Sequence, residues 1–144
     1  MTQRTVLDAS AFDVLDTVKG RRVRALLERT AVEGGEICCA AVTLAEICRG
    51  TARTRRVEAA LARDRGGQRI RVLPTDERLA KLVGAILYET GSGSERLGDA
   101  HVVAVCAGAD AALVLTSDPD DIATLAVAVP GTRVVIRDPA VQSG

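Results

Sequence analysis

Aromatic residues are almost missing from this chain of 144 residues: Phe12 and Tyr88 are the only two, and tryptophan is absent. Proteins that bind single-stranded nucleic acid by stacking its bases use aromatic side chains for this purpose. The sequence therefore argues against recognition by stacking. It also requires a core built from alanine, valine, leucine and isoleucine.

Metal ligands of the sulfur and nitrogen type are scarce as well. The four cysteines form no C-x-x-C pair, and His101 is the only histidine. A structural zinc site needs four such ligands at suitable spacing, so the sequence argues against zinc. We expect the cysteines to be reduced, buried thiols in a reducing cytosol.

Long hydrophobic runs are absent too. A membrane-spanning helix needs roughly 18 consecutive apolar residues, and a signal peptide needs an apolar core near the N-terminus. The chain has neither feature, and we expect a soluble, cytoplasmic protein with no membrane partner. Its composition, 47% hydrophobic and 26% charged residues, is that of a globular protein. We expect one domain over residues 1–144.

Short β-branched and apolar runs alternate with amphipathic stretches along most of the chain. The pattern predicts strands at residues 5–7, 37–40, 70–73, 112–116 and 133–136. It predicts helices at about 10–17, 21–33, 43–62, 76–87, 98–109 and 119–126. Because strands and helices alternate, we expect an α/β fold with a mainly parallel sheet and helices on both faces.

Two acidic residues follow predicted strands. Asp8 comes directly after strand 5–7, and Asp118 comes two residues after strand 112–116. In open α/β sheets, ligands bind outside the carboxyl ends of the strands. If both strands are central and parallel, the two carboxylates lie at the same edge of the sheet.

Two further acids belong to predicted helices. Asp99 shares a helix face with the apolar residues three, four and seven positions later, which directs its carboxylate inward. Such a carboxylate is costly to bury unless it is paired, hydrogen-bonded or bound to a metal; alternatively, Asp99 caps its own helix. Glu46 flanks an apolar stripe, and its alternative role is in a capping box with Thr43.

Carboxylates gathered at one sheet edge are the ligand set of a hard cation such as Mg²⁺ or Mn²⁺. Without the metal they repel one another, which raises their pKa values. With the metal, open coordination positions accept water and phosphate oxygens, so the site suits hydrolysis of a phosphodiester bond.

Several polar neighbours could support these acids. Ser10, Thr116 and Ser117 could hold them in place or ligate through water, and their alternative role is capping and turn formation. Asp120 opens the last predicted helix, where an acid also favours the positive helix end. His101 lies about 200° round the helix from Asp99, so we expect it to point away from the site.

Four segments carry a resemblance to a known family: residues 7–10, 44–47, 98–104 and 115–122. They resemble the four acidic motifs of PIN-domain nucleases. Their order and spacing are similar to those of the VapC toxins of bacterial toxin–antitoxin pairs, and the resemblance covers almost the whole chain. The first motif has Ala9 where relatives often have Thr, whereas Ser10 matches.

The resemblance implies a PIN-like α/β/α sandwich with the activity of an Mg²⁺- or Mn²⁺-dependent endoribonuclease. It implies a homodimer and a cognate antitoxin protein. It also implies that four carboxylates bind the metal and are catalytic, those of Asp8, Glu46, Asp99 and Asp118. Asp120 lies where some relatives have a further acid.

Charge is unevenly distributed, although the chain is neutral overall. Residues 49–75 contain eight arginines and two acids, a local charge of +6. With the resemblance, the first of these arginines become candidates for contacts with RNA phosphates: Arg49, Arg53, Arg55 and Arg56. The alternative is a solvated helix face or a surface that docks an acidic protein.

Two other hypotheses stay open at this point. The helices at 11–18 and 21–33 are candidates for the antitoxin groove, with plain core packing as the alternative. The whole chain could also be a catalytically inactive PIN-like module that binds a protein or RNA partner. A missing acid would favour that module, and none of the four is missing.

Overall fold

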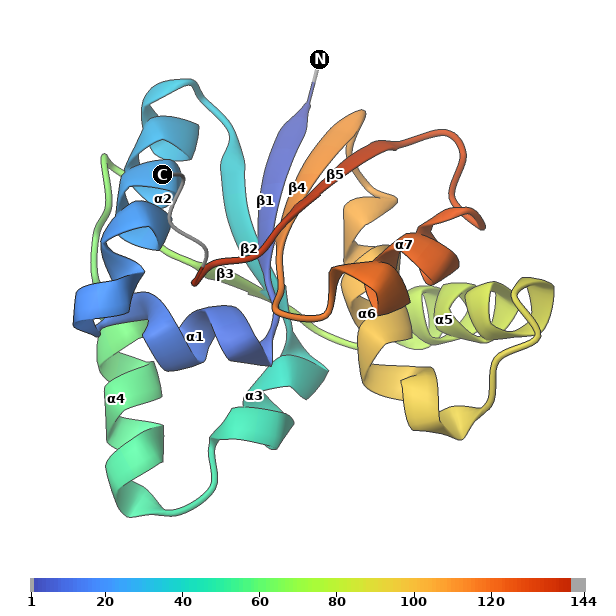
Figure 1. The fold of residues 1–144 in the computed structure, drawn as a ribbon, viewed down its shortest axis with the longest axis horizontal. Coiled ribbons are helices and arrows are strands. Elements are labelled where there is room, and N and C mark those ends of the chain that lie inside the picture. The colour runs from blue at the N-terminus through green and yellow to red at the C-terminus, as the bar shows by residue number, and fades with distance from the viewer. Residues whose placement is uncertain (1, 141–144) are drawn as a thin grey trace.

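Five parallel strands form the centre of the molecule (Figure 1). The computed structural model describes residues 2–140, so residues 1 and 141–144 of the predicted domain lie outside the described residues. The sheet has the order β3-β2-β1-β4-β5. Its strands are β1 Gln3–Leu7, β2 Glu36–Ala40, β3 Arg71–Leu73, β4 Ala111–Leu115 and β5 Arg133–Arg137. The predicted α/β fold with a parallel sheet is confirmed.

Helices cover both faces of the sheet, which makes three layers (Figure 1). α1, α2 and α4 pack on one face, and α5, α6 and α7 pack on the other. The helices are α1 Ala9–Leu15, α2 Arg21–Val32, α3 Ala41–Ile47, α4 Thr51–Ala62, α5 Glu77–Glu89, α6 Leu97–Cys106 and α7 Pro119–Ala126. In the described residues, none of the helices is long and apolar enough to cross a membrane.

Strand alternation divides the interior into two apolar cores. Val6 and Val114 point toward α5, α6 and α7, whereas their neighbours Leu7 and Leu115 point toward α1, α2 and α4. All four of these side chains are fully buried. The two cores bury β1 and β4 on both faces, and two of the predicted acids, Asp8 and Asp118, follow the ends of these strands.

The predicted helix over 43–62 is wrong in two respects. α3 begins at Ala41, directly after β2, so Thr43 lies inside the helix and is 1% exposed. Thr43 is therefore not an N-cap, and the capping-box role for Glu46 is wrong. The chain then leaves the helix after Ile47 and passes Gly50, whose φ of 88° is left-handed, before α4 begins.

The cysteines are free thiols, as predicted. Burial raises the pKa of Cys38 to about 11 and the pKa values of Cys39 and Cys106 to about 12. Cys48 is half-buried. Thiols with pKa values this high are structural and are not nucleophiles at neutral pH.

Two glycines offer a direct test of the packing. A Cβ at Gly20 would collide with the backbone carbonyl oxygens of Val14 and Leu15, whereas a Cβ at Gly84 in α5 meets no described atom within 4 Å. We expect Gly20→Ala to destabilise the protein by about 1–3 kcal/mol or more. Gly84→Ala should stabilise it by up to about 1 kcal/mol. Urea unfolding measures both changes, and a Gly20→Ala variant as stable as the wild type would contradict the structure.

Candidate functional site

The carboxyl ends of β1 and β4 lie side by side at the centre of the sheet, with Leu7 opposite Leu115. From β1 the chain adds β2 and β3 on one side and then β4 and β5 on the other, so the strand order reverses between β1 and β4. A crevice at such a switch point is where ligands bind in open α/β sheets. Asp8 directly follows β1, and Asp118 follows β4 after a short loop.

Asp8 is held firmly at this edge. It is 8% exposed and occupies the N-cap position of α1. The Ser10 hydroxyl donates to its Oδ1 at 2.5 Å, and the Ala11 N–H donates to the same atom at 3.2 Å. These bonds fix the orientation of the carboxylate.

The predicted supporting residues tie the two strand ends together. The Ser117 N–H donates to the Ser10 hydroxyl at 2.9 Å, and the Asp118 N–H donates to the Thr116 hydroxyl at 3.0 Å. Thr116 is fully buried. Ser10 therefore positions Asp8 against the loop after β4, while Thr116 and Ser117 shape the turn that carries Asp118.

Asp99 projects from the first turn of α6 and is half-buried. The N-cap position of α6 is Arg96, so the alternative role of Asp99 as the cap of its own helix is wrong. Burial raises the pKa of Asp99, and the carboxylates of Asp121, Asp8 and Asp118 raise it further. The guanidinium of Arg96 acts in the opposite direction and lowers this pKa.

Glu46 brings a further carboxylate to the same place from the end of α3. Its Oε1 lies so close to α6 that a Cβ on Gly98 would be 2.6 Å from it. The residue as a whole is exposed, yet its carboxylate end is shielded by α6. Burial of this end raises the pKa of Glu46, and the charges of Asp99 and Asp8 raise it further.

Asp121 is the acid that the sequence interpretation did not select. It lies in the first turn of α7, and its Oδ1 is 3.2 Å from Nη1 of Arg96. Among the neighbouring charges, that of Asp121 raises the pKa of Asp99 most. Asp120, the predicted supporting residue, is exposed. The position of Asp121 three residues after Asp118, which is the N-cap residue of α7, is the signal that could have identified it.

His101 is buried, at 5% exposure, and its Nδ1 lies 2.8 Å from the carbonyl oxygen of Leu97, to which it donates. The sequence places it away from Asp99. The structure brings it close enough to Glu46 for a charge on its ring to lower the pKa of that carboxyl. The hydrogen bond to Leu97 keeps its Nδ1 within its own helix.

The donor set suits a hydrated divalent cation. In the described part of the chain, no three Asp, Glu, His or Cys side chains lie close enough to hold one metal ion directly. Mg²⁺ commonly keeps several waters and is bound by one or two carboxylates. Besides burial, repulsion between the carboxylates raises the pKa values of Asp99 and Glu46. A bound cation would relieve this repulsion.

The arginines predicted to bind RNA begin beside the acids and continue along α4. The charge of Arg49 lowers the pKa of Glu46. Nη2 of Arg53 forms an ion pair with Oδ1 of Asp13 at 3.0 Å, a contact that sequence spacing did not reveal. Arg55 and Arg56 are exposed.

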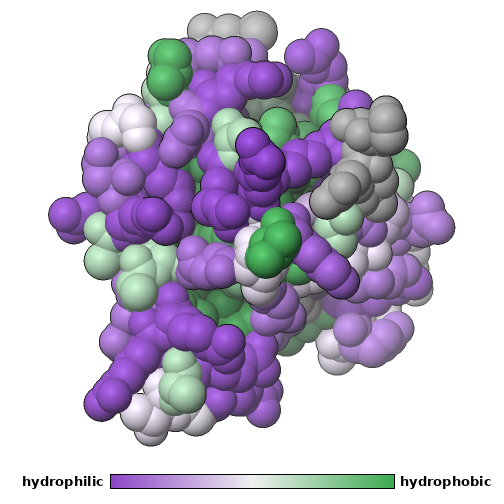
Figure 2. All heavy atoms as spheres, turned by 60° about the vertical axis from the view of Figure 1, so that its left-hand side comes forward, coloured by the Kyte–Doolittle hydropathy of each residue, from purple (hydrophilic) through white to green (hydrophobic). Residues whose placement is uncertain are grey.

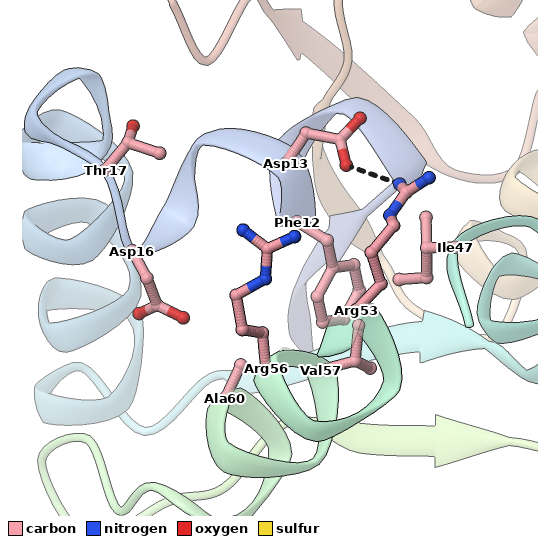
Figure 3. A pocket seen from close by; sticks show the side chains of 9 residues that line it. All are labelled: Phe12, Asp13, Asp16, Thr17, Ile47, Arg53, Arg56, Val57 and Ala60. Carbon is pink, nitrogen blue, oxygen red and sulfur yellow. Dashed lines mark hydrogen bonds and ion pairs between the residues drawn. The ribbon is translucent and has the colours of Figure 1, made fainter. Parts of the chain in front are cut away.

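A groove separates α1 from α4 on the face in Figure 2, where hydrophilic side chains surround a hollow with hydrophobic atoms at its floor. The groove has a volume of about 330 Å³. Figure 3 shows Phe12, Ile47 and Val57 along the floor, with Arg53 reaching to Asp13 across the rim. Of the two helices predicted for the antitoxin, α1 lines this groove and α2 does not; Arg24 of α2 lines a neighbouring hollow with Ala59 and Ala60 of α4.

Comparisons with known proteins were made against families, curated sequences and solved structures. The family model described as PIN domain matches residues 5–127. A chain in the crystal structure of VapBC2 from Rickettsia felis, bound to a DNA fragment from their promoter, superposes with a TM-score of 0.65. The match covers 94% of this chain and 99% of that chain at 14% identity. The curated sequences give no match.

The electrostatics of the site predict a stabilising substitution. Because the folded-state pKa of Asp99 is raised, its ionisation at neutral pH disfavours the folded state. In EDTA at pH 7, Asp99→Asn should raise the melting temperature by roughly 2–4 °C, equivalent to about 1 kcal/mol at this size. The gain should shrink as pH falls through the raised folded-state pKa of Asp99 and vanish below about 3, where the carboxyl is protonated in both states.

Asp120→Asn is the matched control for this measurement, because Asp120 is an exposed acid close to Asp118 in the chain. It should leave the melting temperature unchanged or slightly lower, since it removes a charge near the start of α7. A loss of stability in Asp99→Asn at pH 7 would contradict the repulsion described here.

Proposed function

The chain belongs to the PIN domain family, and on this premise we propose that it is a divalent-metal-dependent endoribonuclease, the toxin of a toxin–antitoxin pair. We also propose that residues 1–144 form a single PIN-like domain, that the protein is a homodimer and that it is cytoplasmic. The observation that carries it is the convergence of carboxylates from four separate segments at the switch point of the sheet. The charges of Asp8 and Asp118 act on Asp99, and the charges of Asp99 and Asp8 act on Glu46.

These four carboxylates would hold Mg²⁺ or Mn²⁺, directly or through bound water. The cation supplies a coordinated water of lowered pKa and neutralises charge on the scissile phosphate. Ser10 keeps Asp8 in a fixed orientation, through a bond of 2.5 Å to Oδ1. Asp121 adds negative charge beside Asp99 and holds Arg96 at the rim of the site.

An acidic site repels RNA, so a basic surface must offset this repulsion. The arginines that start at Arg49 lie next to Glu46, and Arg55 and Arg56 extend the positive charge along α4. We propose that they contact RNA phosphates. Arg53 forms an ion pair with Asp13, and we expect a smaller contribution from it.

The groove between α1 and α4 is the proposed surface for the cognate antitoxin protein. Its apolar floor suits the apolar face of an amphipathic helix. Its rim carries opposite charges, with Asp13 and Asp16 from α1 and its end, and Arg53 and Arg56 from α4. VapBC2 of Rickettsia felis was solved bound to promoter DNA, and the proposal extends a VapB-type partner to this chain.

Cleavage of total cellular RNA by the purified, partner-free protein tests the nuclease. The wild type should cut with Mg²⁺ or Mn²⁺ and lose activity in EDTA. Glu46→Gln and Asp99→Asn should each reduce the rate by at least about a hundredfold, the scale of groups that activate water, while Asp120→Asn should retain it. A folded, metal-loaded wild type that cuts no RNA would instead support the inactive PIN-like interaction module. Activity that survives Asp99→Asn would reject the site.

RNA binding by the arginines is tested with charge reversals in catalytically inactive protein. Arg55→Glu and Arg56→Glu should weaken binding and reduce the slope of log affinity against log salt by about one for each lost phosphate contact. Arg133→Glu is the control, because Arg133 is exposed at the start of β5, the opposite edge of the sheet. Equal binding and equal slopes in all three variants would exclude these RNA contacts.

A further inference from the structure

Gly98 and Glu46 make a contact that no other residue at position 98 would permit. Gly98 is the second residue of α6 and directly precedes Asp99. A Cβ placed there would lie 2.6 Å from Oε1 and 3.5 Å from Cδ of Glu46. Approaches below 3.0 Å do not occur between real Cβ atoms and their neighbours. The Glu46 carboxylate thus occupies the space that a side chain at position 98 would need.

The backbone does not explain a glycine at this position. Gly98 lies within α6, where the backbone conformation is open to any residue and glycine is a poor helix former. In Gly50 and Gly91, by contrast, φ values of 88° and 63° favour glycine for conformational reasons. The close approach of Glu46 is the feature of the structure that requires glycine at position 98.

We propose that Gly98 is a positioning residue for the acidic cluster: it leaves room for Glu46 to lie against α6 beside Asp99, where both carboxylates can serve one divalent cation. The inference rests on the proposed function. α3 and α6 are in contact, so the distance between Glu46 and Asp99 is set by how closely the two helices' side chains approach. A methyl group at this contact would widen that distance.

The atom in the way is the end of a flexible side chain that is otherwise exposed. Gly98→Ala should therefore fold normally, because Glu46 can swing away from α6 into solvent. In this respect the position differs from Gly20, where backbone carbonyls would be struck. A substitution at Gly98 can therefore displace the Glu46 carboxylate without lowering the stability of the fold.

The test is Mn²⁺ binding by calorimetry to the full-length protein, with thermal unfolding in EDTA alongside it. We expect Gly98→Ala to bind Mn²⁺ about tenfold or more weakly, the scale of residues that orient metal ligands. Its melting temperature without metal should equal or exceed that of the wild type. Gly84→Ala is the matched control, since the same change in α5 meets open space, and it should bind Mn²⁺ as the wild type does.

A double-mutant cycle with Glu46→Asp separates displacement of Glu46 from a general effect on α6. Aspartate is one methylene shorter, so its carboxylate stays clear of a Cβ at position 98. Glu46→Asp alone should weaken Mn²⁺ binding, and adding Gly98→Ala to it should cause no further loss. A loss from Gly98→Ala that is the same with Glu46 and with the shorter residue would overturn the inference.

Two other outcomes are equally decisive. Wild-type affinity for Mn²⁺ in Gly98→Ala overturns the inference and leaves the proposed function intact. A wild type that binds no Mn²⁺ and cuts no RNA overturns the proposed function, and the inference with it.

Discussion

Repulsion between carboxylates at the carboxyl edge of β1 and β4 is the constraint on which the rest of this structure depends. Asp8 is buried after β1, Asp99 and Glu46 approach it from α6 and α3, and Asp121 approaches Asp99 from α7. Burial and like charge raise the pKa values of Asp99 and Glu46. A fold that gathers negative charge in this way must stabilise the strand ends from elsewhere. The two apolar cores on the faces of the sheet provide that support.

Local contacts reduce the cost of the cluster without removing it. The hydroxyl of Ser10 and the backbone of α1 hold Asp8, and Arg96 forms an ion pair with Asp121 while lowering the pKa of Asp99. The guanidiniums of Arg96 and Arg49 cannot neutralise all five carboxylates, those of Asp8, Glu46, Asp99, Asp118 and Asp121, so negative charge remains for a cation. Positive charge lies beside the cluster, along α4, where Arg55 and Arg56 are exposed and could attract an anionic polymer toward the acids.

Much of this arrangement can be predicted from the sequence, because it depends on patterns within single strands and helices. A short apolar strand ending in Asp8 and a buried strand ending near Asp118 place two acids at one edge once the sheet is parallel, and the inward stripe of α6 adds Asp99. The capping pattern of Thr43 and Glu46 misled, because α3 starts directly from β2 and buries Thr43.

Other features depend on how distant elements pack, and sequence patterns do not contain that information. The choice between Asp120 and Asp121 depends on which side of α7 faces α6. The pairing of Arg53 with Asp13 joins residues forty positions apart. The approach of Glu46 to Gly98 depends on the contact between α3 and α6.

The central claim, that these carboxylates form one divalent-metal site, is tested most directly by a crystal structure grown with Mn²⁺ and measured at the manganese absorption edge. We expect an anomalous peak beyond the carboxyl ends of β1 and β4, in contact with Asp8 or Asp99, with the neighbouring acids turned toward it. Peaks found only elsewhere on the protein, at a Mn²⁺ concentration that supports RNA cleavage, would contradict it.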